Sequence, residues 1–170
     1  MRIYLIGFMG SGKSTLGKQL SEISGLKFID LDQEIEKLAK QTIDQIFNTQ
    51  GEAEFRFIEK TCLDRTFLDD NIIVATGGGT PCFFEGIKKM NRFGISVYLN
   101  CGKGTLFHRL AKDKKNRPVI KDMKDVDLAE RILDLMAKRE KYYTKAKIIV
   151  EEDDIDANIL WGKLNERVKE

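Results

Sequence analysis

The fold is decided by a stretch near the start of the chain, Gly7-Phe8-Met9-Gly10-Ser11-Gly12-Lys13-Ser14-Thr15. An apolar run, residues 3–6, precedes this stretch, and apolar side chains at helical spacing follow it at Leu16, Leu20 and Ile23. The order of strand, glycine-rich turn and helix fits the phosphate-binding pattern G-x-x-x-x-G-K-[ST]. A glycine-rich turn that arose by chance would need neither the preceding strand nor the following helix, so we predict a nucleotide-binding loop.

The glycines of this loop have a physical purpose. A backbone that wraps a polyphosphate must turn its N–H groups inward, which requires dihedral angles and a close approach that a Cβ atom would block. The following helix adds its first N–H groups and the positive end of its dipole. We expect Lys13 to reach the β- and γ-phosphates and the Ser14 hydroxyl to bind Mg²⁺. The residues expected to contact ATP here are Gly10, Ser11, Gly12, Lys13, Ser14 and Thr15.

Length and composition narrow the class of protein. A chain of 170 residues is long enough for one domain with a sizeable core, and we expect a single domain over 1–170. The net charge of +2, from 29 basic and 27 acidic residues, is too balanced for a nucleic-acid-binding surface. No apolar run approaches the roughly 18 residues of a membrane span. The three cysteines lack C-x-x-C spacing, which favours packing thiols in a reducing compartment. We therefore expect a cytoplasmic monomer.

Apolar runs alternate with helical patterns along the chain. After the first strand, runs at 27–29, 72–75, 95–99 and 148–150 predict four more strands. Helical spacing predicts helices at about 32–40, 43–47, 52–68, 103–112, 126–145 and 155–168, and another that opens at about Pro81. This alternation predicts an α/β protein with a P-loop NTPase fold, a three-layer α/β/α sandwich around a five-stranded parallel sheet. The charged stretch at about 112–125 predicts a mobile lid within that domain.

Acidic residues that could serve the metal follow one strand. The strand at 72–75 ends without an acid and the strand at 95–99 is followed by Asn100, so Asp30 and Asp32 are the strand-end acids nearby. Mg²⁺ prefers oxygen ligands and keeps several waters, so Asp30 could act through a water while Ser14 binds directly. Asp32 would then meet the acceptor substrate. The alternative is that Asp32 only caps the next helix, but capping does not explain the pair.

Arginines and glycines provide the remaining candidates. Arg56 lies in the apolar stripe of its helix, where an arginine either extends its head group to solvent or grips an anion. Three glycines at a strand end, Gly77–Gly79, are costly in backbone entropy unless a backbone or ligand passes close by. Arg117 lies in the lid stretch, where it could close over phosphates, and Arg139 lies on the long helix at 126–145.

Taken together, these residues resemble the shikimate kinase family over nearly the whole chain. The resemblance rests on G-x-x-G-x-G-K-S-T at 7–15, Asp30-x-Asp32, Gly51-Glu52-x-x-Phe55-Arg56-x-x-Glu59, Thr76-Gly77-Gly78-Gly79, Arg117-Pro118 and Met136-x-x-Arg139-x-x-x-Tyr143. It implies phosphorylation of the 3-hydroxyl of shikimate by ATP with Mg²⁺, in aromatic amino acid biosynthesis. Whether Asp32 would be a true base or an anchor stays open.

The resemblance also implies roles for individual residues. The catalytic residues would be Lys13, Asp32 and Arg117, with Ser14 and Asp30 at the metal. Arg109 would lie beside the adenine and Arg117 would come from the lid. Shikimate would contact Asp32, Arg56, Gly77, Gly78, Gly79 and Arg139, with the two arginines on its carboxylate.

One segment departs from the family pattern, and two other functions compete. The family often places an arginine and a proline against the adenine after the last strand, but this chain has the acidic run 151–154, which leaves nucleotide affinity open. A related kinase for another hydroxylated acid, such as gluconate, would share the loop. A nucleotide-binding sensor without catalysis would have lost Lys13, Asp32 or Arg117, and none of them is lost.

Overall fold

Five parallel strands form the centre of the protein in the computed structural model, which describes residues 1–112 and 124–168. The strands are β1 (Arg2–Ile6), β2 (Lys27–Asp30), β3 (Ile72–Ala75), β4 (Ile95–Leu99) and β5 (Ile148–Val150). Their order across the sheet is β2-β3-β1-β4-β5. The predicted five-stranded parallel sheet is therefore confirmed, because each of the four neighbouring pairs of strands in this order is parallel.

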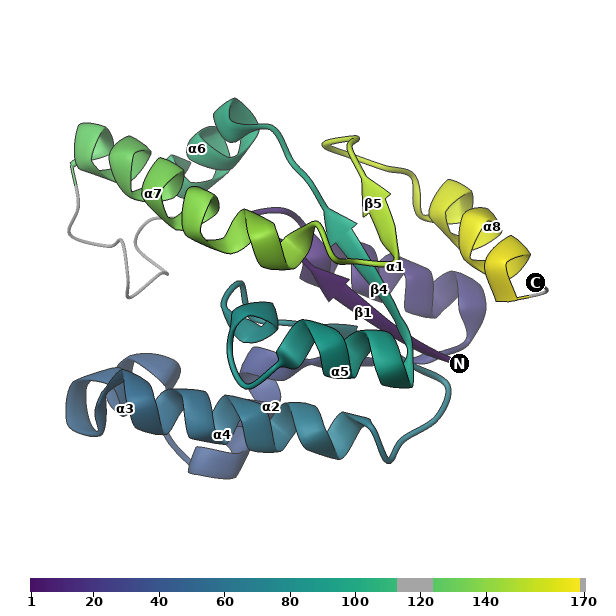
Figure 1. Ribbon diagram of the computed structural model, residues 1–170, viewed down its shortest axis with the longest axis horizontal. Helices are drawn as coiled ribbons and strands as arrows, with labels where there is room; N and C mark the ends of the chain where they lie inside the picture. Colours follow the sequence, from purple (N-terminus) through teal and green to yellow (C-terminus); the bar gives the residue numbers. More distant parts are fainter. Residues whose placement is uncertain (113–123, 169–170) are drawn as a thin grey trace.

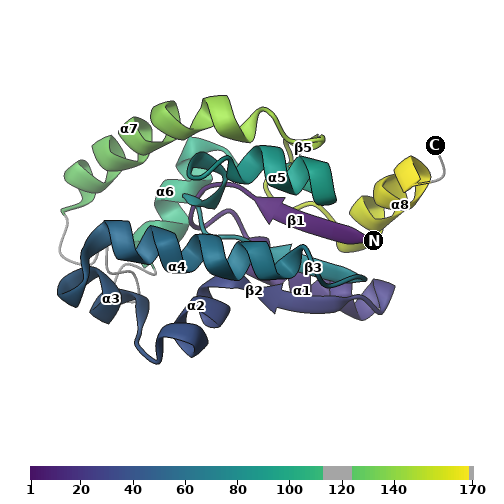
Figure 2. The ribbon, with the colours of Figure 1, turned by 60° about the horizontal axis from the view of Figure 1, so that its bottom comes forward.

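Helices cover both faces of the sheet. They are α1 (Lys13–Ser24), α2 (Leu31–Ala39), α3 (Ile43–Thr49), α4 (Gly51–Thr66), α5 (Gly86–Phe93), α6 (Lys103–Lys112), α7 (Asp125–Tyr143) and α8 (Ala157–Val168), with a short 3₁₀ turn η1 (Thr80–Cys82). Helices α4, α5 and α7 lie side by side in both ribbon views, with α5 between the other two (Figure 1, Figure 2). Helices α1 and α8 pack together against the opposite face. This is the predicted three-layer sandwich.

Alternation along β1 shows how the sequence builds the two layers. Ile3 and Leu5 point to the α1 and α8 side, while Tyr4 and Ile6 point to the other core, and all four are fully buried. Successive side chains of a strand face opposite sides of the sheet, so a strand that is apolar at every position needs a cover on both sides. Amphipathic helices on both faces of the sheet provide this cover.

One predicted helix start is wrong. The helix expected from about Pro81 begins at Gly86, and Pro81 lies instead in η1. Phe84 and Glu85 separate the two elements with φ angles of 47° and 58°, in the left-handed region that interrupts a right-handed helix. Gly86 is required next, because a Cβ atom there would lie 2.2 Å from the carbonyl oxygen of Thr80.

Two further predictions concern a lid and the absence of a membrane span. The predicted lid at about 112–125, which includes Arg117, falls largely on residues 113–123 and so lies outside the described residues. Within the described ranges, none of the helices combines the length and the apolar character needed to cross a bilayer.

Candidate active site

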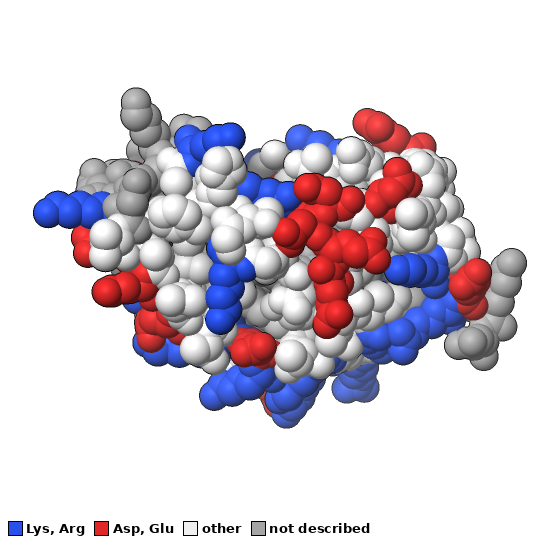
Figure 3. All heavy atoms as spheres, turned by 90° about the horizontal axis from the view of Figure 1, so that it is seen from above, with Lys and Arg blue, Asp and Glu red and all other residues white. Residues whose placement is uncertain are grey.

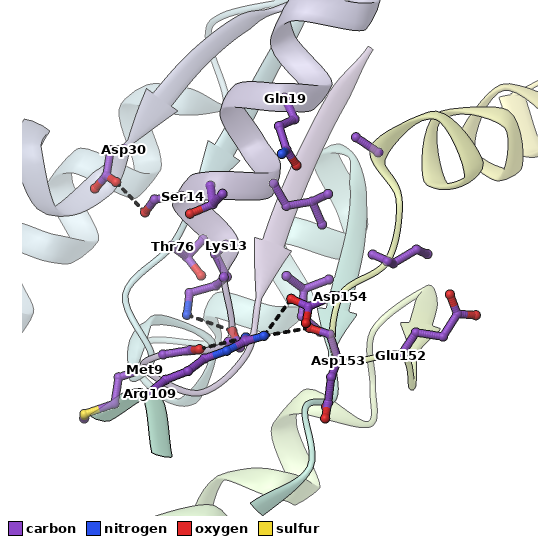
Figure 4. A pocket seen from close by; sticks show the side chains of 18 of the residues that line it. Met9, Lys13, Ser14, Gln19, Asp30, Thr76, Arg109, Glu152, Asp153 and Asp154 are labelled. Atoms are coloured by element: carbon purple, nitrogen blue, oxygen red, sulfur yellow. Dashed lines mark hydrogen bonds and ion pairs between the residues drawn. The ribbon is translucent and has the colours of Figure 1, made fainter. Parts of the chain in front are cut away.

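A cleft of about 880 Å³ opens at the carboxyl ends of the strands, and the phosphate loop forms its floor. Asp30 lies at one end of the cleft, and Arg109 lies at the other with Asp153 and Asp154 (Figure 4). Asp32 and Gly77 line the end of Asp30, and residues 152–158 line the end of Arg109. Such edges collect ligands in open parallel sheets, because several loops and helix N-termini converge there. The predicted site residues at strand ends are therefore brought into one cleft.

The phosphate loop has the backbone that its glycines predict. Gly7, Gly10 and Gly12 have φ angles of 146°, 81° and 89°, and a Cβ atom at Gly7 would lie 2.8 Å from the carbonyl oxygen of Leu99. Gly12 is the N-cap of α1, and no side chain among the described residues caps this helix. Lys13 is buried and donates hydrogen bonds to the carbonyl oxygens of Gly7 and Phe8 at 3.0 and 2.8 Å. The ammonium of Lys13 is therefore held against the backbone of the phosphate loop.

Asp30 connects the metal-binding candidates with the start of α2. The hydroxyl of Ser14 donates to Oδ2 of Asp30 at 2.7 Å, and Oδ1 of Asp30 accepts from the backbone N–H of Asp32 at 3.1 Å. Asp30, not Asp32, is therefore the side-chain cap of α2. This removes the capping alternative for Asp32 and leaves its carboxylate for another role. Two adjacent oxygen donors beside the phosphate loop fit what Mg²⁺ prefers.

The carboxylate of Asp32 has an unusual environment. Asp32 is exposed to solvent in the cleft, but many protein atoms lie near its carboxylate, and the resulting desolvation raises the pKa of Asp32 to about 6. The carboxylates of Asp30 and Glu59 raise the pKa further, whereas the ammonium of Lys13 lowers it. A carboxylate with a pKa closer to neutrality is a stronger base than an ordinary one, which suits a group that receives a proton.

Arg56 is part of a buried network rather than a solvent-facing head group. Its side chain is 11% exposed, and its guanidinium donates to Glu59 at 2.8 Å and to Glu52 at 3.2 Å. Glu59 also accepts from the hydroxyl of Thr80 at 2.6 Å. The rings of Phe55 and Phe83 lie 4.9 and 4.3 Å from the guanidinium carbon. Such a network fixes the plane of the arginine before any ligand arrives.

The three glycines after β3 lie against the candidate side chains. A Cβ atom at Gly77 would lie 2.8 Å from a carboxylate oxygen of Glu59 and 3.3 Å from Asp32. One at Gly78 would lie 3.1 Å from Arg139, and one at Gly79 would lie 2.7 Å from Arg56. These three glycines are therefore needed because other side chains approach their backbone closely, and not because their backbone is left-handed.

Arg139 faces the same glycines from α7. Its Nη1 is buried and has no hydrogen-bond partner among the described residues. Its neighbour Tyr143 is buried and donates its hydroxyl hydrogen to the carbonyl oxygen of Gly78 at 2.5 Å. A buried guanidinium donor without a partner is costly, so this arrangement favours an acceptor supplied by a ligand.

At the other end of the cleft, the acidic run binds Arg109. Nη2 of Arg109 donates to the Asp154 carboxylate at 2.7 Å and to the carbonyl oxygen of Asp153 at 3.2 Å, while Nη1 donates to the carbonyl oxygen of Gly10 at 3.3 Å. The Asp153 carboxylate accepts from the N–H of Gly102 at 2.7 Å and from the hydroxyl of Thr105, at the start of α6. Figure 3 shows acidic side chains gathered on the side from which the β5–α8 loop projects. The acidic run 151–154, which departs from the family pattern, therefore belongs to a loop that these hydrogen bonds hold in place.

The structure brings together most of the predicted site residues but not all of them. Arg117 lies outside the described residues. Sequence reasoning missed the roles of Thr80, Phe83, Asp153 and Asp154, and it quoted Glu59 without assigning it a role. Glu59 could have been found, because it lies three residues after Arg56 on one helix, a spacing that places two side chains together.

Comparison with known proteins agrees with this geometry. A family model described as "Shikimate kinase" matches residues 9–168. The shikimate kinase of Bacteroides thetaiotaomicron is 38% identical over 156 residues, which cover 92% of this chain and 89% of that protein. A crystal structure of shikimate kinase from the same organism has a TM-score of 0.91 at 36% identity and covers 100% of this chain and 99% of its own. A shikimate kinase from Acinetobacter baumannii, solved in complex with shikimate, has a TM-score of 0.87 at 32% identity and covers 98% of this chain and 92% of its own. The chain therefore belongs to the shikimate kinase family.

Proposed function

We propose that this chain transfers the γ-phosphoryl group of ATP to the 3-hydroxyl of shikimate, giving shikimate 3-phosphate and ADP. Its family makes it a kinase of the shikimate pathway with a P-loop for the nucleotide. The observation that carries the proposal is the convergence of Arg56, Arg139 and Asp32 on three glycines beside the phosphate loop. Two guanidinium groups and one carboxylate match a small ring that bears one carboxylate and several hydroxyls.

The phosphate loop and its neighbours would hold the nucleotide. The backbone of residues 10–15 and the ammonium of Lys13 would bind the phosphates, with Lys13 exchanging its present carbonyl partners for phosphate oxygens. Ser14 and Asp30, whose oxygens lie 2.7 Å apart, would hold Mg²⁺. The metal ion, when bound, supplies charge neutralisation on the phosphate oxygens. Arg117 would add positive charge from the chain between α6 and α7.

The acceptor end would position the attacking hydroxyl. Arg56 and Arg139 would bind the shikimate carboxylate, and Nη1 of Arg139, which has no hydrogen-bond partner among the described residues, supports this role. Asp32 would accept a hydrogen bond from the hydroxyl and take its proton as the oxygen attacks phosphorus, a role that its pKa of about 6 supports. The backbone of Gly77–Gly79 would close the pocket. Phosphoryl transfer needs mainly positioning and charge neutralisation, and these groups supply both.

The reaction can be tested by following ADP release from Mg·ATP. We expect strong stimulation by shikimate, weak stimulation by gluconate and little release with water alone. Stimulation by gluconate and not by shikimate would indicate a kinase for another hydroxylated acid. ATP binding without stimulation by any acceptor would indicate a nucleotide-binding sensor.

We also propose that the whole chain, 1–170, acts as one kinase domain, as a monomer in the cytoplasm. The three cysteines, Cys62, Cys82 and Cys101, are free thiols in the structure, which supports a reducing compartment. Analytical ultracentrifugation at micromolar concentration tests the monomer, for which a single species of about the chain mass of 19.5 kDa is expected.

A further inference from the structure

Arg109 connects two walls of the cleft that are far apart in the sequence. Its guanidinium bonds to Gly10 of the phosphate loop on one side and to Asp153 and Asp154 after β5 on the other. In Figure 4 the side chain of Arg109 lies between Lys13 and Asp154, and dashed lines mark its hydrogen bonds to the loop after β5. Arg109 therefore spans the cleft from one wall to the other.

The purine base of the nucleotide must lie at this end, and this step rests on the proposed function. The phosphate loop fixes the polyphosphate in the middle of the cleft, and Asp32 with Gly77 and Gly78 occupies the acceptor end. The remaining length of the cleft is lined by Arg109, by residues 152–158 and by Gln19, Glu22 and Ile23 of α1. A guanidinium plane stacks well on an aromatic base, but only if its orientation is held.

We propose that Asp154 is a positioning residue for the nucleotide: its ion pair with Arg109 holds the guanidinium against the base. Asp153 makes this possible, because its bonds to Gly102 and Thr105 anchor the loop that carries Asp154. Glu152 lies in the same loop but points away from Arg109 and forms a long ion pair with Lys163 at 3.9 Å (Figure 4). Two acids of one loop thus have the same charge and different contacts.

Charge alone predicts the opposite effect for Asp154. ATP with its phosphates is strongly anionic, so a nearby carboxylate weakens binding by repulsion, and its removal should tighten binding. If Asp154 acts by positioning Arg109, its removal should weaken binding instead. The sign of the change separates the two roles.

The test compares Asp154→Asn with Glu151→Gln, two substitutions that each remove one negative charge from the loop, because Glu151 is exposed and lies outside the cleft lining. We expect Asp154→Asn to raise the KM for Mg·ATP about three- to fivefold, the size of one well-placed exposed ion pair. The KM for shikimate should stay within twofold, and Asp154→Glu should restore most of the affinity. Glu151→Gln should leave the KM for Mg·ATP unchanged or slightly lower. A lower KM for Mg·ATP in Asp154→Asn would overturn the proposal, because it would show that Asp154 acts only as a charge.

A double-mutant cycle tests whether Asp154 acts through Arg109. We expect Arg109→Ala to raise the KM for Mg·ATP and Asp154→Asn to add nothing in that background. A further rise in the double variant would overturn the proposal, because it would indicate direct contact between Asp154 and the nucleotide. Calorimetric titration with Mg·ADP needs no acceptor. It should show the same order of affinities even if shikimate is not the acceptor, so the inference and the proposed function can fail separately.

Discussion

The two arginines at the two ends of the cleft differ in their surroundings. At the acceptor end, Arg56 is 11% exposed and pairs with Glu59, which is 2% exposed. At the nucleotide end, Arg109 is 29% exposed and pairs with Asp154, which is 87% exposed. An ion pair between an arginine and a carboxylate is therefore buried at one end of the cleft and lies at the surface at the other.

This difference follows from what holds each ligand. The phosphate loop anchors a nucleotide through many backbone N–H groups, so the base end needs only a modest contribution from side chains. A small acceptor has no such anchor and must be oriented by the pocket itself. A buried charge pair that loses one partner costs far more than an exposed pair, because the remaining charge stays desolvated. The comparison predicts large effects at the acceptor end and small ones at the surface.

The largest effect is expected at the acceptor end, at Asp32. Asp32→Asn keeps the shape of the side chain but cannot accept a proton, so kcat should fall by a factor on the order of 10² to 10⁴. The affinity for Mg·ATP, measured by calorimetry, should change little. Glu34→Gln on the same helix is the control, because Glu34 pairs with Lys37 and faces no ligand. An unchanged kcat in Asp32→Asn would show that the carboxylate is an anchor and not a base.

The next effect is expected at the buried partner of Arg56. Glu59→Gln keeps a hydrogen-bond acceptor but removes the charge that compensates Arg56, so the KM for shikimate should rise about tenfold. The free energy of unfolding in urea should fall by about 1–3 kcal/mol, because a buried charge loses part of its compensation. The KM for Mg·ATP should not move.

Asp154→Asn provides the matched comparison at the surface, with a stability loss expected below about 1 kcal/mol. Equal losses in the two variants would contradict the view that burial separates the two pairs. A stability loss in Glu59→Gln without a change in the KM for shikimate would show that Glu59 serves the fold alone.

The fold could be predicted, and candidate residues for the acceptor site could be named, because their signals are local. The phosphate loop, the strand-end acids and the triple glycine are each encoded by neighbouring residues. The contacts at the nucleotide end join residues about 50 positions apart, as between Asp153 and Gly102, and no local pattern reports them. The helix expected from Pro81 was placed too early because the left-handed conformations of Phe84 and Glu85 have no glycine to signal them.

A smaller effect is expected at Phe83, which contacts Arg56 from outside the buried network. The ring lies 4.3 Å from the guanidinium carbon and is 39% exposed. Phe83→Leu keeps an apolar side chain but removes the π face, a loss of about 0.5–1 kcal/mol for an exposed cation–π pair. The KM for shikimate should rise about two- to fivefold, while kcat and the KM for Mg·ATP stay the same.

Phe84→Leu is the control for that prediction. Phe84 is the next residue, is also exposed and has the left-handed backbone, so the variant tests whether disturbing this turn alone matters. A rise of the same size in both variants would mean that the turn, and not the ring of Phe83, orients Arg56.

The smallest effect is expected at Asp64, which lies on α4 outside the cleft lining and accepts hydrogen bonds from Lys60 and Lys89. Partial burial raises the pKa of Asp64, but the two lysines outweigh burial and hold the pKa below its ordinary value of 3.8. A carboxyl whose folded pKa is lowered stabilises the fold above the unfolded pKa, and this stability is lost as the pH falls through the folded pKa. Asp64→Asn should therefore lower the free energy of unfolding at pH 7 by only about 0.5 kcal/mol, since the pair is screened by solvent.

Urea unfolding at pH 7 and at pH 3, with and without added salt, measures this contribution. The difference between the native chain and Asp64→Asn should shrink at pH 3 and in high salt, where protonation or screening weakens the pair. A loss above about 2 kcal/mol at pH 7 would place this half-buried cluster in the range of a buried network. Exposure would then not explain why Arg56 and Arg109 differ, and the explanation would have to come from the number of partners that each guanidinium binds.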